Sequence, residues 1–190
     1  EKTLKQSVDY RLIADVEIGS ILSGGIDSSL LSAMMAQKVK PPINTYTVKF
    51  QEKGFDETPF AQMVAKRYKT KHHELEIPAD LYLSSMNEYL QYKDEPIGVP
   101  NEVALYLLFK KIKKTSTVVL AGEGADEIFA GYGRIFRSPF DFIKQTLLSP
   151  NVDFTSFFLD TYGYFSDYDL DQIMKKEYIC NYRNIFHSYL

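Results

Sequence analysis

The stretch Ser23-Gly24-Gly25-Ile26-Asp27-Ser28-Ser29 lies between a predicted strand over 16–22 and a predicted helix over 28–38. Two adjacent glycines let the backbone turn tightly and approach an anion without interference from a Cβ atom. The first turn of the following helix adds free N–H groups and the positive end of the helix dipole. Two glycines alone fit an ordinary strand-to-helix turn, but the whole heptamer after a buried strand predicts a phosphate-binding loop.

Two common phosphate-binding loops differ from this stretch. A Walker A loop needs a lysine before its final serine or threonine, and the dinucleotide-binding loop needs a third glycine. The stretch has neither feature. Asp27 is informative because a carboxylate inside a phosphate cradle repels the phosphate unless a metal cation lies between them. We therefore expect a phosphate group and a metal ion at this loop.

Strand-like and helix-like segments alternate through the first two thirds of the chain. Strands separated by helices favour a twisted parallel sheet with helices on both faces, the α/β class. Ligands bind beyond the carboxyl ends of such strands, so the loops at 23–28 and 122–127 are expected on the same rim. The patterns predict strands over 16–22, 44–50, 72–77 and 118–121, and helices over 1–14, 28–38, 56–68, 81–92 and 102–113.

The pattern changes after Arg137, where aromatic residues become frequent and the sequence is typical of helices and loops in a second layer. We expect one domain over 1–137 and a mostly helical, aromatic-rich continuation of it over 138–190, truncated at its end. An exposed aromatic continuation favours self-association, for example as a homodimer.

Composition excludes several classes of protein. A net charge of −3 argues against a general nucleic-acid binder, which needs a basic surface. The longest apolar runs, such as 103–109, are too short to span a bilayer, so no membrane association is expected. Cys180 is the only cysteine, which excludes an intrachain disulfide and favours a reducing, cytoplasmic location.

A second loop narrows the interpretation. The stretch Leu120-Ala121-Gly122-Glu123-Gly124-Ala125-Asp126-Glu127-Ile128-Phe129-Ala130-Gly131-Tyr132 follows the last predicted strand. With Ser23–Ser29 it resembles the PP-loop, or N-type, ATP pyrophosphatases, and among them the glutamine-dependent asparagine synthetases. The resemblance runs in the family's order from about Val16 to Tyr132, and its shorter matches are Tyr46-Thr47-Val48-Lys49-Phe50, Asp56-Glu57, His72-His73-Glu74-Leu75 and Asp94-Glu95-Pro96.

The resemblance implies a Rossmann-like fold of the adenine nucleotide alpha hydrolase type, with the ATP-pyrophosphatase domain over 1–137. It implies Mg²⁺ held between Asp27 and Asp126, and a role in the chemistry for Glu123. For Glu127 a catalytic role and a solvated helix start are equally good interpretations. The residues it assigns to ATP are Leu22 and Val48 by their backbones, Ala121 and Gly122 against the ribose or base, and Ser23, Gly24, Gly25, Asp27, Ser28 and Ser29 around the pyrophosphate.

Ala121 departs from the family pattern, because many members have serine or threonine at this position. The missing hydroxyl removes one contact to the nucleotide, at a cost of about 0.5–1.5 kcal/mol. Backbone contacts at this position remain available to Ala121.

The implied reaction is ATP-dependent amide synthesis. Aspartate attacks the α-phosphorus, pyrophosphate leaves, and ammonia converts the aspartyl-adenylate into asparagine and AMP. Glu123 takes a proton from the ammonia or holds it in place. The ammonia comes from glutamine in a glutaminase domain, which this chain lacks.

Two other interpretations stay open. One keeps the adenylation and changes the carboxylate, as in a sugar-acid amidotransferase or a lactam-forming paralogue. The other is a nucleotide-binding fragment without turnover.

Overall fold

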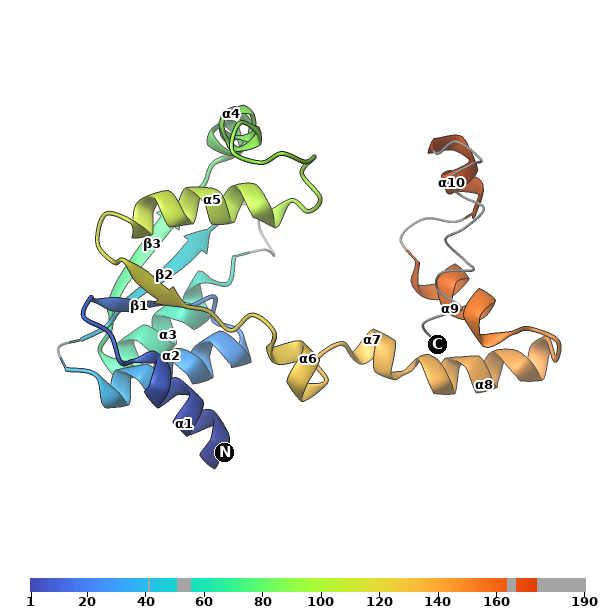
Figure 1. Cartoon of the computed structure of the whole chain (residues 1–190), viewed down its shortest axis with the longest axis horizontal. Coiled ribbons are helices and arrows are strands. Elements are labelled where there is room, and N and C mark those ends of the chain that lie inside the picture. Colours follow the sequence, from blue (N-terminus) through green and yellow to red (C-terminus); the bar gives the residue numbers. More distant parts are fainter. Residues whose placement is uncertain (41, 51–55, 164–166, 174–190) are drawn as a thin grey trace. The chain divides into compact units, whose positions relative to one another are not determined.

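The computed structural model describes residues 1–40, 42–50, 56–163 and 167–173 (Figure 1). The chain divides into two compact units, Glu1–Glu123 and Gly124–Leu190. The domain boundary expected at Arg137 stays a prediction. Cys180 lies outside the described residues.

The first unit contains a four-stranded parallel sheet with the strand order β3-β2-β1-β4. The chain moves outward from β1 to β3 and then returns to the other side of β1. The strand order therefore reverses between β1 and β4, which is the position where ligands bind in sheets of this kind. The strands are β1 (Ile18–Ile21), β2 (Asn44–Lys49), β3 (Lys71–Glu76) and β4 (Val118–Leu120).

Helices cover both faces of the sheet, as the alternating pattern predicts. Figure 1 shows α1, α2 and α3 on one face and α5 on the other. Side chains of the strands alternate between these faces. These helices are α1 (Lys2–Arg11), α2 (Ile26–Lys38), α3 (Thr58–Tyr68), α4 (Ala79–Leu90) and α5 (Asn101–Ile112).

The first helix is shorter than its predicted range of 1–14, because it ends at Arg11. The N–H of Leu12 closes the last turn on the carbonyls of Val8 and Asp9. Only Val8 of this helix is fully buried, where it packs with Met35 and Ile43. The apolar stripe therefore ends before the predicted boundary, and Ile13 is exposed.

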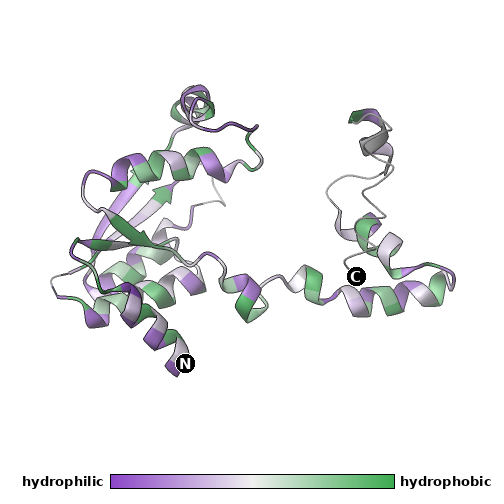
Figure 2. Cartoon of the chain, in the orientation of Figure 1, coloured by the Kyte–Doolittle hydropathy of each residue, from purple (hydrophilic) through white to green (hydrophobic). Residues whose placement is uncertain are grey.

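Tyr46 is the centre of the core on the α5 face. Its side chain is fully buried and packs with Leu108 and Ile112 of α5. Its hydroxyl lies 2.7 Å from Thr115 Oγ1 and 2.6 Å from Ser116 Oγ, so the one polar atom of the ring is satisfied. Figure 2 shows that β4 is hydrophobic along its length, and Val119 of this strand packs against the same cluster.

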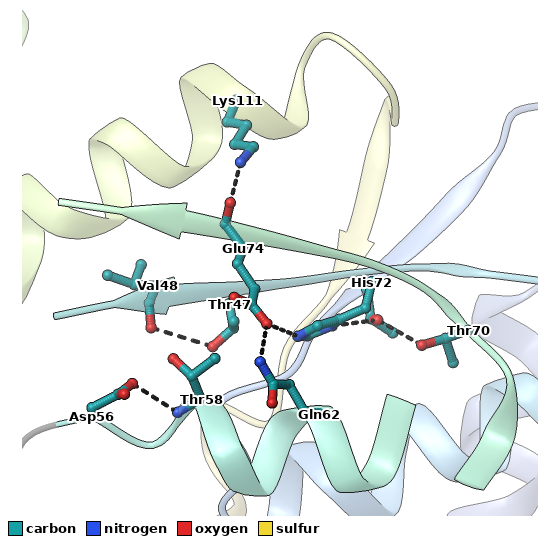
Figure 3. Close-up of polar contacts among 10 residues, drawn as sticks. Thr47, Val48, Asp56, Thr58, Gln62, Thr70, His72, Glu74 and Lys111 are labelled. Atoms are coloured by element: carbon teal, nitrogen blue, oxygen red, sulfur yellow. Dashed lines mark hydrogen bonds and ion pairs between the residues drawn. The ribbon is translucent and has the colours of Figure 1, made fainter. Parts of the chain in front are cut away.

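The opposite face of the sheet carries a polar network around His72 (Figure 3). His72 Nδ1 lies 2.9 Å from Thr45 Oγ1, and its Nε2 lies 3.8 Å from Glu74 Oε1. Gln62 of α3 donates to the same Glu74 oxygen at 2.7 Å. Lys111 of α5 donates to the backbone carbonyl of Glu74 on the edge strand β3. This hydrogen bond occupies an acceptor that a strand of another chain would otherwise pair with.

The second unit is helical in its described part, as expected for the sequence after Arg137. An aromatic cluster of α8 and α9 stabilises it, with Phe142 and Phe154 edge to face at 5.2 Å. Asp153 caps α9 by accepting from Ser156 N at 3.0 Å. Its helices are α6 (Ala125–Phe129), α7 (Gly133–Phe136), α8 (Ser138–Leu148), α9 (Phe154–Tyr162) and α10 (Asp167–Ile173).

None of the helices in the described ranges is long and apolar enough to cross a membrane.

The histidines predict a pH-dependent stability. Burial lowers the pKa of His72, and the Glu74 carboxylate opposes this only in part. Burial, with Lys71 and Lys111 nearby, also lowers the pKa of His73. The unfolded chain therefore binds protons more readily, so stability is fully present above about pH 6.5 and falls as the pH drops below it. Urea unfolding followed by circular dichroism at pH 7.5 and 5.5 measures this change.

The variant His72→Asn, His73→Gln is the control. Each amide is expected to keep the hydrogen bond of the ring nitrogen that it replaces, which joins His72 Nδ1 to Thr45 Oγ1 and His73 Nε2 to Asn44 Oδ1. The difference in stability between the two pH values is expected to shrink in this double variant. An equal difference in wild type and variant would contradict the assignment.

Candidate functional site

The first predicted loop, Ser23–Ser29, packs closely against the start of α3. Gly24 has φ +93°, and a Cβ at this position would lie 2.7 Å from Phe60 Cβ and 2.8 Å from Ala61 N. Only glycine fits both the left-handed backbone and the space. The part played by α3 was not predicted from the sequence, although Asp56-Glu57 before this helix belongs to the pattern that carries the resemblance.

The hydroxyl groups of Ser23 and Ser28 stabilise the loop itself. Ser28 is buried, and its hydroxyl donates to Gly25 O at 3.2 Å. The same Oγ accepts from Ser23 N at 3.2 Å and lies 2.9 Å from Ser23 Oγ. Ser23 Oγ accepts from Gly25 N at 3.3 Å and has Ser28 as its own acceptor. Each of the two hydroxyl protons is therefore used inside the loop. The predicted contacts of Ser23 and Ser28 with a nucleotide stay predictions, and the structure gives both residues a role in shaping the loop.

The start of α2 offers donors for an anion. No side chain within the described ranges caps this helix, whose N-cap is Gly25. Its first N–H groups, from Ile26 to Ser28, have no partners inside the helix by geometry. Ser29 Oγ is buried and has no hydrogen-bond partner among the described residues. A buried hydroxyl without a partner is unfavourable, and the phosphate oxygens of a nucleotide would supply acceptors at this helix end.

The second predicted loop reaches this helix start. A Cβ on Gly122 would lie 3.0 Å from Ser28 N and 3.3 Å from Asp27 Cβ, so the backbone after β4 directly contacts the first turn of α2. Both loops therefore meet at the position where the strand order reverses. Ala121 and Glu123 beside this contact are exposed, and Asp27 is partly exposed in the first turn of α2.

The residues predicted to touch the nucleoside lie at the carboxyl ends of β1 and β2. Leu22 is fully buried against Ala61 and Ala65 of α3, and its N–H donates to Tyr46 O at 2.8 Å. Val48 packs with its side chain into the core on the α5 face. Any contact of Leu22 with a nucleoside therefore has to use its carbonyl, because the N–H is occupied within the sheet.

Asp126 belongs to the second unit, in the first turn of α6. A Cβ on Gly131 would come within 1.7 Å of Asp126 Oδ1, so this glycine leaves the space that the carboxylate fills. Tyr132 donates to Glu127 Oε1 at 2.7 Å, and this hydrogen bond lowers the pKa of Glu127. Glu127 thus already has a partner within its own helix–loop segment.

The described part of the chain contains no group of three histidine, cysteine or acidic side chains arranged for a metal. Mg²⁺ needs only one or two carboxylates when phosphate oxygens complete its coordination. Asp27 and Asp126 are residues of the required type. Their pairing around a metal remains a proposal, because they belong to different units.

A hollow of about 520 Å³ lies at the opposite rim of the sheet, near the amino ends of the strands. Its lining includes Glu17, Asn44, Lys69 and Lys71. None of the predicted site residues contributes to it. We place the candidate site at the two loops, because ligands in this fold bind at the carboxyl ends.

Comparison with known sequences identifies the family. A sequence profile described as asparagine synthase matches residues 1–160. The chain belongs to the asparagine synthase family. Two curated relatives are each 37% identical, a putative glutamine-hydrolysing asparagine synthetase of Mycobacterium bovis over 149 residues and asparagine synthetase 1 of Bacillus subtilis over 133 residues. The rat asparagine synthetase is 31% identical over 140 residues.

These alignments cover 76%, 70% and 70% of this chain, respectively. They cover only 22%, 21% and 25% of the relatives. The chain thus spans about a quarter or less of the length of these proteins. We therefore assign the activity of a whole asparagine synthetase to this chain only as a proposal.

One solved structure supports the fold. An NMN synthetase from Francisella tularensis superposes with a TM-score of 0.50 at 16% identity, over 69% of this chain and 58% of that one. An NH₃-dependent NAD synthetase from Campylobacter jejuni gives a TM-score of 0.49 at 16% identity, over 70% and 58%. The first likeness confirms the Rossmann-type α/β architecture.

The contact at Gly24 predicts a strong difference between the two loop glycines. Gly24→Ala is expected to lower the free energy of unfolding by about 1–3 kcal/mol from backbone strain alone, and further through the clash with Phe60. Gly25→Ala is the matched control. Gly25 has φ −65°, and its new Cβ would meet only Ser23 Oγ, at 3.4 Å. Urea titration of both variants measures the effect, and equal losses would show that the approach of α3 is unimportant.

Proposed function

We propose that the two loops bind ATP and Mg²⁺ and that the protein activates a carboxylate as an acyl-adenylate with release of pyrophosphate. Ammonia then attacks the acyl carbon, and the products are an amide and AMP. Family membership supports ATP-dependent amidation in general. Aspartate as the acceptor, glutamine as the source of ammonia and the cytoplasm as the location belong to this proposal.

One observation carries the proposal. The backbone at Gly122 approaches the start of α2, where Asp27 lies and where the described residues supply neither a side-chain cap for the helix nor a partner for the hydroxyl of Ser29. Free N–H groups and a helix dipole favour a phosphate there, while Asp27 opposes it unless a cation is bound. The site is thus suited to a nucleotide phosphate that arrives together with a metal.

The residues of the chain have distinct roles in the proposed reaction. N–H groups of α2 and the hydroxyl of Ser29 bind the leaving pyrophosphate. Asp27 and Asp126 are the residues that would hold Mg²⁺, and the bound metal would supply positive charge to neutralise the leaving pyrophosphate. The acceptor carboxylate is ionised near neutral pH and attacks without a general base. Glu123 is exposed beside Gly122, and there it orients the ammonia or removes its proton.

A second candidate function keeps the nucleotide site and changes the acceptor to another carboxylic acid. The exposed Ala121, where many family members have a hydroxyl, motivates it. Pyrophosphate release measured with aspartate and a panel of other acids distinguishes the two. ATP binding without release from any acid would leave only a nucleotide-binding module.

For Asp27 we predict that Asp27→Asn lowers pyrophosphate release by on the order of 100-fold or more, because one ligand of the metal is lost. Asp80→Asn is the matched control, since Asp80 has the equivalent position in the first turn of α4. A coupled assay for pyrophosphate with the complete gene product measures both. Near-normal release by Asp27→Asn refutes the role in metal binding.

For Glu123 we predict that Glu123→Gln lowers amide formation by about 100-fold while adenylation continues, because the amide cannot accept a proton. Pyrophosphate release and amide formation are measured in the same reaction. The two rates are expected to separate in the variant. If both rates stay at the wild-type level, Glu123 has no part in the reaction.

A further inference from the structure

The connector between α4 and α5, residues 91–100, lies on the same side of the sheet as the two nucleotide loops. A helix that leads into a parallel strand runs antiparallel to it, so α5 begins near the carboxyl ends of the strands. Figure 1 shows α5 beginning on the side where β2 and β4 end. Among the described segments on this rim, the connector is the longest that the nucleotide site does not use.

One carboxylate organises this connector. Glu102 Oε1 accepts from the backbone N–H groups of Gly98 and Val99, each at 3.2 Å. Glu102 Oε2 accepts from Tyr89 OH at 3.0 Å and from Lys93 Nζ. Both oxygens are thus used, and they join α4, the connector and α5.

The surroundings of this carboxylate differ from those of an ordinary surface ion pair. The side chains of Lys93 and Glu102 are only 15% and 20% exposed, and the hydrogen bond from Lys93 lowers the pKa of Glu102. Exposed ion pairs contribute little, whereas charge-assisted bonds to backbone N–H groups are among the stronger ones. Tyr82 adds a hydrogen bond of 2.7 Å to Pro100 O. The side chains of Glu102 and Tyr82 therefore fix the backbone between residues 98 and 100 by hydrogen bonds.

The outer side of the connector is open. The side chain of Glu95 is 75% exposed and lies 3.4 Å from Lys93 Nζ, and Val99 is 55% exposed. A fixed backbone with exposed side chains is an arrangement suited to contact with a ligand, because the loop is ordered before binding.

We propose that Glu102 is a positioning residue, which holds residues 94–100 of the connector as a wall of the subsite for the acceptor carboxylate. This inference rests on the proposed function. ATP occupies the rim at β1 and β4, and the attacking acid has to approach the same rim from beside it. Glu102 acts through the connector and does not itself touch the acid.

The test compares Glu102→Gln with Glu88→Gln in the complete gene product. Glu88 is a matched control, because its Oε1 also accepts from a tyrosine and a lysine, Tyr106 OH and Lys110 Nζ, both at 2.7 Å. It joins α4 to α5 without contacting the connector backbone. Three quantities are measured: amide hydrogen exchange of Gly98 and Val99, the affinity for ATP, and the half-saturating concentration of the acceptor acid in pyrophosphate release.

Glu102→Gln is expected to speed exchange of both amides and to raise the half-saturating acid concentration about tenfold, with ATP affinity unchanged. Glu88→Gln is expected to change none of the three. An unchanged acid concentration in Glu102→Gln, or an equal rise in Glu88→Gln, overturns the inference. Absence of pyrophosphate release from wild type with every acid marks instead the failure of the proposed function.

Discussion

The close approach of three backbone segments at the carboxyl end of β1 is the constraint on which the candidate site depends. The loop at Gly24 packs against the first residues of α3, and Gly122 after β4 packs against the first turn of α2. Neither contact leaves space for a larger residue without movement of the backbone. The start of α2 is thereby fixed in position, and its N–H groups form a preorganised site for an anion.

The serines of the first loop have two different roles: two stabilise the conformation of the loop, and one is available to a ligand. Ser23 and Ser28 use their hydroxyl protons on each other and on the loop backbone, which holds the loop in its turn. Ser29 is left with a buried hydroxyl that has no partner in the described chain. A rigid cradle with an unsatisfied donor costs stability in the free protein, and a bound phosphate would recover it. The carboxylate of Asp126 occupies the space that Gly131 leaves.

Polar networks outside the two loops stabilise the rest of the first unit. The His72 network joins α3 to the edge strand, and Glu102 joins α4, the connector and α5. Glu102 accepts four hydrogen bonds, as a partly buried charge requires, whereas His72 has a hydrogen bond at Nδ1 and lies 3.8 Å from Glu74 with its Nε2. Only the Glu102 contacts order backbone on the rim of the two loops, whereas the His72 network lies near the amino ends of β2 and β3.

The order of short-range signals along the chain was enough to predict the elements and the loops. Apolar runs before Gly24 and Gly122 and helical periodicity after 28 and over 102–113 are local properties, so they can be read without a structure. The heptamer at Ser23 and the stretch 120–132 together also allowed the family to be recognised, because both resemble its motifs. Only the tertiary structure decided that Gly122 lies on Ser28, that α3 packs on Gly24 and that Glu102 holds Gly98 and Val99. These contacts depend on the strand order and on which side chain reaches which backbone atom, and neither is encoded in local periodicity.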